Sequence, residues 1–121
     1  MKRVMISQPM KNKSKEEIIK VREDAVNLLE DLNYKVIDTY FENKFHNKYE
    51  DNNSEERNVW CVVNIPIFFL AKSLEKMAEC DAVYFCKGWK EARGCICEHK
   101  VAEMYNLEIL YEENYESNTD N

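Results

Sequence analysis

Short apolar runs alternate with amphipathic segments along this chain of 121 residues, and that alternation is the strongest constraint on its fold. Four runs are short and apolar enough to be strands buried on both faces. They are residues 3–7, 34–38, 81–86 and 107–111. Because a strand, a helix and a second strand in succession form a right-handed parallel unit, the sequence predicts an α/β three-layer sandwich. Its sheet should be small and mostly parallel, with four or five strands.

The predicted helices have clear start signals. Ser14 and Glu17 form a Ser-x-x-Glu capping box ahead of an amphipathic segment. That segment ends near Asn33, where asparagine can adopt a left-handed cap. Pro66 suits the first turn of a second helix. A third helix surrounds Glu98. The pattern predicts one domain over residues 1–111, and residues 112–121 are predicted to be a frayed acidic tail.

The expected strand order places the second strand first, followed by the first, third and fourth. In an open parallel sheet, ligands bind beyond the carboxyl ends of the strands where the order reverses. That point lies between the first and third strands, which lead into residues 7–10 and 87–89. We therefore expect a ligand pocket between these two loops.

Composition and charge exclude several functional classes. The net charge is −6 and no segment is basic, which argues against a nucleic-acid partner. No apolar run approaches the roughly 20 residues of a membrane span, and the first residues do not resemble a signal peptide. Five cysteines without a disulfide-like spacing indicate a reduced, cytoplasmic protein. Cys95 and Cys97 would point about 200° apart on a helix, so we expect no metal, and no other cofactor is expected.

Glu98 is the most informative single residue. At about 100° per residue it lies near the centre of an otherwise apolar helical stripe of roughly 120°. The other members of that stripe are Cys95, Val101, Ala102 and Tyr105. A buried carboxylate is costly unless it is paired, hydrogen-bonded or open to a pocket. Glu98 is therefore either a site residue or a structural carboxylate paired with Arg22 or Arg93.

Several short motifs together resemble a known group of proteins. They are the loop at residues 6–10, the strand at 81–85, Gly88-Trp89, and the helix start with Gly94, Glu98 and Ala102. Over residues 1–111 the chain resembles small phage and bacterial proteins of unknown function that are similar to the nucleoside 2-deoxyribosyltransferase family. The resemblance implies the same Rossmann-like fold.

The resemblance also implies an activity. In those transferases and the related nucleotide N-glycosidases, a glycine precedes the glutamate that attacks the sugar, and the matching residues here are Gly94 and Glu98. The first-strand loop of those enzymes holds the base or sugar, which implicates Ser7, Gln8 and Met10. One departure is clear: the transferases carry an aspartate six residues before the nucleophile, where this chain has Ala92.

Other candidates come from the residues themselves. Gly88 and Trp89 follow a strand end, where the indole could stack on a base, and Arg93 near a helix start could bind a phosphate. A group that protonates the departing base is also required. Candidates for that acid or base are Asp38, Tyr40, Glu42 and His46.

Alternative interpretations stay open for several residues. Trp89 could equally be a core aromatic, Gln8 a loop hydrogen-bonding residue, and Arg93 a surface ion pair. Asp81, at the start of its strand, is expected to cap or turn the chain. His99 is expected to point about 100° away from Glu98, toward solvent or an interface.

Three functional classes remain, of which the last is an oligomeric scaffold whose pocket is vestigial. The first is an enzyme that hydrolyses or transfers at the N-glycosidic bond of a small nucleoside or nucleotide. The second is a non-catalytic protein of the same fold that binds a nucleotide or sequesters a nucleotide signal. The resemblance further implies a homo-oligomer, in which the irregular segment 39–59 could complete a neighbour's pocket. The sequence leaves open the base, the sugar and the acceptor.

Overall fold

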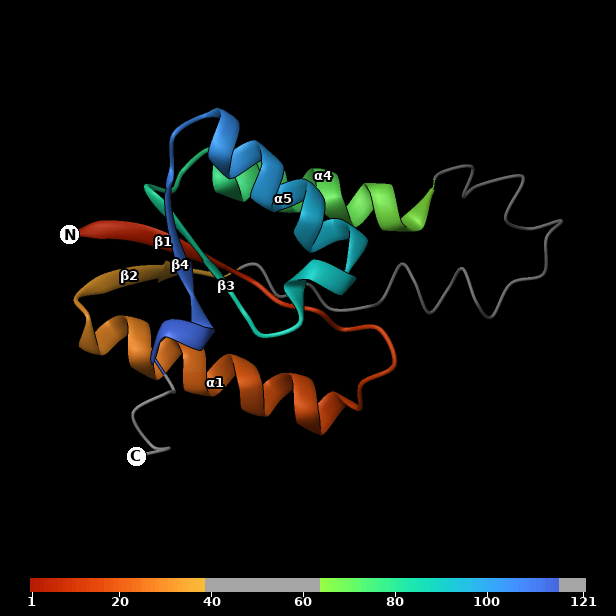
Figure 1. Cartoon of the computed structure of the whole chain (residues 1–121), viewed down its shortest axis with the longest axis horizontal. Coiled ribbons are helices and arrows are strands. Elements are labelled where there is room, and N and C mark those ends of the chain that lie inside the picture. The colour runs from red at the N-terminus through yellow and green to blue at the C-terminus, as the bar shows by residue number, and fades with distance from the viewer. Residues whose placement is uncertain (39–63, 116–121) are drawn as a thin grey trace, which may run out of the picture.

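The computed structural model describes residues 1–38 and 64–115, and it confirms the α/β sandwich (Figure 1). Its sheet has four strands, all parallel, in the predicted order β2-β1-β3-β4. The strands are β1 (Lys2–Ser7), β2 (Tyr34–Ile37), β3 (Ala82–Phe85) and β4 (Glu108–Tyr111). The order reverses between β1 and β3, so the carboxyl ends of these two strands lie side by side.

Helices cover both faces of the sheet. The helix α1 (Lys15–Asp31) lies on one face, and α4 (Ile65–Met77) and α5 (Arg93–Met104) lie together on the other (Figure 1). Successive side chains of a strand point to opposite faces, so each central strand contributes to two cores. Val4 and Ile6 pack with Ala25 and Leu29 of α1, whereas Met5 packs in a separate cluster on the opposite face. That second cluster contains Met77, Cys80, Val83, Phe85 and Ala102.

The start of the central strand pair is fixed by Asp81, through hydrogen bonds to β1 rather than through the cap or turn expected from its position. Its carboxylate accepts a hydrogen bond from the backbone N–H of Arg3 at 2.9 Å. Its own backbone N–H donates to the carbonyl of Arg3 at 2.8 Å. Asp81 therefore sets the β1–β3 register at the end of the sheet opposite the expected pocket.

The ends of α1 follow the sequence signals. Ser14 is the N-cap, and both halves of the capping box with Glu17 are formed. Asn33 has a φ of 73° just after the helix, which confirms the left-handed termination. Pro66 lies in the first turn of α4, also as predicted.

Two expectations are wrong, one about the end of the helix around Glu98 and one about the C-terminal residues. The helix α5 ends at Met104, so Tyr105 leaves the buried stripe and is 71% exposed. The chain from Glu112 is not frayed at once, because Glu112–Tyr115 forms a 3-10 helix. Residues 116–121 and the segment 39–59 lie outside the described residues. Within the described ranges, no helix combines the length and apolarity needed to cross a membrane.

Replacing Ser14 with alanine removes the side-chain acceptor of the capping box. We expect the free energy of unfolding to fall by about 1 kcal/mol, measured by urea denaturation followed by circular dichroism. Ser14→Asp, which supplies another N-cap acceptor, should keep most of the stability. An unchanged unfolding midpoint in Ser14→Ala would show that packing alone defines the start of α1.

Candidate functional site

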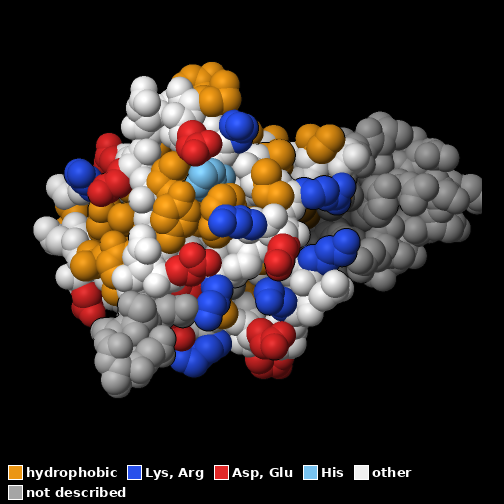
Figure 2. All heavy atoms as spheres, viewed as in Figure 1, with side chains coloured by type: hydrophobic (Ala, Val, Ile, Leu, Met, Phe, Trp, Pro, Cys, Tyr) orange, Lys and Arg blue, Asp and Glu red, His pale blue; other side chains and the backbone are white. Residues whose placement is uncertain are grey.

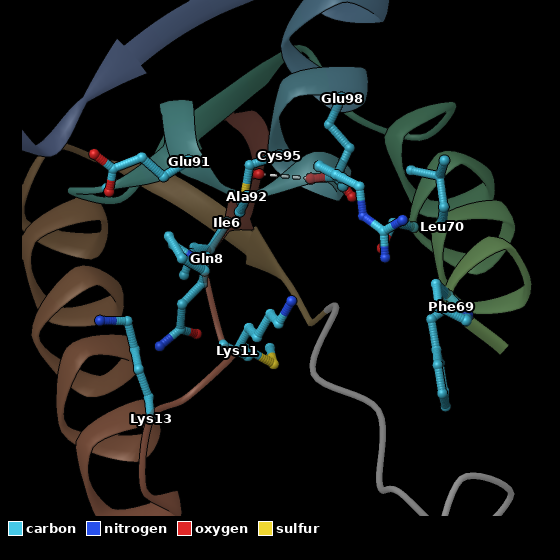
Figure 3. A pocket seen from close by; sticks show the side chains of 18 of the residues that line it. Ile6, Gln8, Lys11, Lys13, Phe69, Leu70, Glu91, Ala92, Cys95 and Glu98 are labelled. Atoms are coloured by element: carbon cyan, nitrogen blue, oxygen red, sulfur yellow. Dashed lines mark hydrogen bonds between the residues drawn. The ribbon is translucent and has the colours of Figure 1, made fainter. Parts of the chain in front are cut away.

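A cavity of about 620 Å³ lies at the predicted switch point (Figure 3). It is bounded by the loop after β1, the loop after β3, the first turns of α5 and one side of α4. Most of the predicted binding residues line it, namely Ser7, Gln8, Met10, Gly88, Arg93 and Gly94, together with Glu98. The sequence-based position of the pocket is therefore correct.

Glu98 lies in the second turn of α5 and is buried, with 6% of its surface exposed. The hydroxyl of Ser7 donates a hydrogen bond to its Oε1 at 2.5 Å, and Ser73 of α4 also favours the charged form of this carboxyl. Within the described residues, neither Arg22 nor Arg93 forms an ion pair with it. The partners of Glu98 are thus hydroxyl groups, and the alternative of a structural ion pair is not supported.

Burial raises the pKa of the Glu98 carboxyl, and the hydrogen bonds from Ser7 and Ser73 oppose that rise. The folded protein therefore binds a proton at Glu98 at pH values where the unfolded chain has already lost it. Such a combination of desolvation and specific partners in a cavity is typical of a functional carboxyl group.

Ser7 is positioned by the sheet itself. It is the last residue of β1, pairs with Phe85 in the register of β3, and its carbonyl accepts from the N–H of Cys86 at 2.9 Å. Burial raises the pKa of the neighbouring Cys95 thiol to about 11, and Ser7 opposes that rise. Cys95 is consequently neutral near pH 7.

Gln8 lines the cavity, but both ends of its side-chain amide form hydrogen bonds with residues of α1. Its Nε2 donates to the carbonyl of Ile18 at 2.7 Å, and its Oε1 accepts from Arg22 Nη1 at 3.1 Å. The structure therefore favours the loop hydrogen-bonding role for Gln8 over recognition of a base.

The structure places Trp89 outside the cavity lining, contrary to the base-stacking prediction. Its ring stacks on His99 with centroids 4.1 Å apart, and both rings pack against Phe85 and Tyr111. His99 is not directed to solvent either: its side chain is 13% exposed and its Nε2 lies 2.7 Å from the Tyr111 hydroxyl. In Figure 2 the pale blue histidine lies among hydrophobic side chains.

Asp38, the acid/base candidate at the end of the second strand, does not line this cavity. Asp38 is exposed, and its Oδ1 lies 3.4 Å from Nη2 of Arg22. It borders a separate, smaller depression beside α1. Tyr40, Glu42 and His46 lie outside the described residues.

The cavity also contains residues that the sequence analysis did not select. Glu91 brings a second carboxylate, Ser73 a hydroxyl, and Phe69 and Leu70 an apolar wall. Lys11 and Lys13, from the loop after β1, also line the cavity. Of these residues, only Lys11 and Lys13 could have been selected from the sequence, because they immediately follow the loop already assigned to the pocket.

The start of α5 opens onto the cavity. Its N-cap, Ala92, makes no side-chain capping bond, so the first backbone N–H groups have no side-chain acceptor there. A side chain at Gly94 would meet no atom within 4 Å. A ligand therefore has room beside these donors. Among residues 1–38 and 64–115, no cluster of three or more histidine, cysteine, aspartate or glutamate side chains could hold a metal ion.

Comparison with known proteins gives one match. Residues 67–111 match the model of a domain of unknown function, DUF4406. The matched part spans most of α4, β3, α5 and β4, so it carries Ser73, Gly94 and Glu98 but not Ser7 or the lysines. No curated protein and no solved structure shows a significant match.

Replacing Glu98 with glutamine should stabilise the protein near neutral pH. Because burial places the folded pKa above the unfolded one, the stability linked to this carboxyl is full below the unfolded pKa and is lost as pH rises through the folded pKa. Glutamine keeps the shape without the charge. We expect Glu98→Gln to unfold at higher urea concentration than the wild type at pH 8, with a smaller difference at pH 4.5. Glu79→Gln, at an exposed position, is the control; equal curves for wild type and Glu98→Gln at both pH values would contradict this account.

Removing the Ser7 hydroxyl should raise the pKa of Glu98 further, because that hydrogen bond favours the charged form. Carbon-13 NMR titration of the glutamate carboxyls in wild type and Ser7→Ala would measure the change. Ser73→Ala should act in the same direction from the opposite side. A Glu98 titration that is identical in all three proteins would show that the hydroxyls do not tune this group.

Proposed function

We propose that this protein cleaves the N-glycosidic bond of a small nucleoside or nucleotide, with Glu98 as the nucleophile. The observation that carries the proposal is the buried carboxylate on the cavity floor, held by Ser7 and Ser73 at the sheet's switch point. The resemblance of residues 1–111 to the nucleoside 2-deoxyribosyltransferase family supports it, since the glutamate and the preceding glycine match.

The reaction proceeds through two displacements. A Glu98 oxygen forms a bond to the anomeric carbon as the bond from that carbon to the base nitrogen breaks, and the electron pair leaves with the base, which takes up a proton. Water or a second base then attacks the same carbon and gives its proton to the group that protonated the first base, and the bond to Glu98 breaks to restore the carboxylate. The hydrogen bond from Ser7 orients the carboxylate and favours its charged form, which is the form that attacks.

Glu91 is the group we assign to the proton transfer. It lines the cavity in the segment before α5, one residue before the position where the transferases carry their aspartate. In Figure 3 its carboxylate points away from Glu98. Substrate binding must therefore bring the base toward the Glu91 side, with the sugar at Glu98.

The cavity lining suits such a ligand. Ser7 and Gly94 lie beside Glu98 and would face the sugar, while Met10, Phe69 and Leu70 offer apolar contact to a base. Gly88 lets the loop turn close to Pro9, since its φ is 88°. Arg93 at the cavity rim favours a phosphorylated sugar over a free nucleoside.

The test is incubation of the pure protein with nucleosides, deoxynucleosides, their phosphates and NAD, followed by chromatography for free base. We expect base release from at least one substrate, reduced by roughly a thousandfold or more in Glu98→Gln, the scale on which loss of a nucleophile acts. Glu103→Gln, at an exposed position of the same helix, should keep the rate. Full activity in Glu98→Gln would refute the proposal.

A second function is favoured by the outward direction of Glu91 and by Ala92, which leave no acid beside Glu98 among the described cavity residues. On this hypothesis the protein holds a nucleotide intact. It predicts that a ligand from the panel co-elutes with the protein and is recovered unchanged after long incubation. Release of free base during that incubation would exclude it.

A further inference from the structure

Three cationic side chains border the cavity, although the protein as a whole is acidic. They are Lys11 and Lys13 from the loop after β1 and Arg93 from the first turn of α5. None of the three forms an ion pair within residues 1–38 and 64–115. Figure 2 shows lysine and arginine side chains gathered around the start of α5. The lining thus carries three cationic side chains against two carboxylates, Glu91 and Glu98, and this excess favours an anionic ligand.

The cations do not converge on a single point. In Figure 3 the amine of Lys11 extends toward the middle of the cavity, below Cys95 and Glu98, whereas Lys13 extends along the side bordered by Gln8. Arg93 belongs to a different element, at the start of α5. The cations thus come from two elements on different sides of the cavity, the loop after β1 and the first turn of α5. A chain of two phosphates offers a separate anionic group to each element, which a single phosphate does not.

We propose that the natural ligand carries two linked phosphate groups, as a nucleoside diphosphate or a dinucleotide joined by a diphosphate. Each phosphate brings negative charge and acceptor oxygens that pair with lysine or arginine. The N–H groups of α5's first turn, which have no side-chain cap, add donors beside Arg93. The volume of about 620 Å³ leaves room for these groups beyond a sugar and a base. The inference rests on the proposed function for the position of the sugar.

Inorganic pyrophosphate and inorganic phosphate, compared by isothermal titration calorimetry at low salt, test the charge arrangement without any base. We expect pyrophosphate to bind at least about tenfold more tightly, as two charge-assisted contacts replace one. Lys11→Ala, Lys13→Ala and Arg93→Ala should each weaken pyrophosphate binding by about tenfold. Lys15→Ala and Lys100→Ala, exposed and outside the cavity, are matched controls. Equal affinities for the two anions, or variants that bind like the wild type, would overturn the proposal.

ADP, NAD, AMP and adenosine then distinguish the two sources of a diphosphate. Tighter binding of ADP than NAD identifies the nucleoside diphosphate, and the reverse order identifies the dinucleotide. Either order supports the proposal when pyrophosphate competes for the site, while AMP binding as tightly as both contradicts it. Base release is scored separately: diphosphate binding without release would refute the glycosidase and leave this inference intact. Release of free base from unphosphorylated nucleosides, with equal binding of pyrophosphate and phosphate, would support the glycosidase and refute this inference.

Discussion

The hydrogen bond from Ser7 to Glu98 is the interaction on which the site depends. It joins the last residue of β1 to the second turn of α5, across 91 positions of sequence, at 2.5 Å. A buried carboxylate without partners would cost several kilocalories per mole, so α5 can dock only where Ser7 and Ser73 meet Glu98. The bond forms only when β1 and β3 are neighbours and α5 packs over their carboxyl ends. The parallel strand order and the cavity chemistry are therefore parts of one arrangement.

This arrangement carries a cost to stability. Burial that raises the pKa of Glu98 also makes its charged form a strained, poorly solvated anion. Proteins retain such groups mainly at functional sites. The hydroxyls of Ser7 and Ser73 reduce the free-energy cost of burying the charged carboxylate, and the hydrogen bond from Ser7 fixes its direction. The lysine and arginine side chains at the cavity rim suit an anionic ligand. The aromatic cluster of Trp89, His99 and Tyr111 supports α5 from outside the cavity and does not contribute to its lining.

Local patterns predicted much of the fold. The capping box at Ser14, the left-handed Asn33 and Pro66 depend on a few neighbouring residues, and all three lie where the sequence placed them. The stripe around Glu98 was also correct except at Tyr105, because helical periodicity does not say where a helix stops. Three-dimensional packing decided the rest. Ser73 belongs to α4, and the spacing of residues in the sequence does not show how α4 packs against α5. Trp89 stacks on His99 and does not face the cavity.

The central claim is that Glu98 forms a bond to a sugar, and trapping tests it most directly. A fluorine at the sugar's 2-position destabilises the oxocarbenium-like transition states and slows breakdown of a glycosyl-enzyme. The protein would be mixed with 2-fluoro-substituted nucleosides and their phosphates, then analysed by intact mass and peptide mapping. We predict a mass increase equal to the fluorinated sugar, or its phosphate, on the peptide that contains Glu98. Release of base from an unmodified protein, or an adduct on any other residue, would contradict the account.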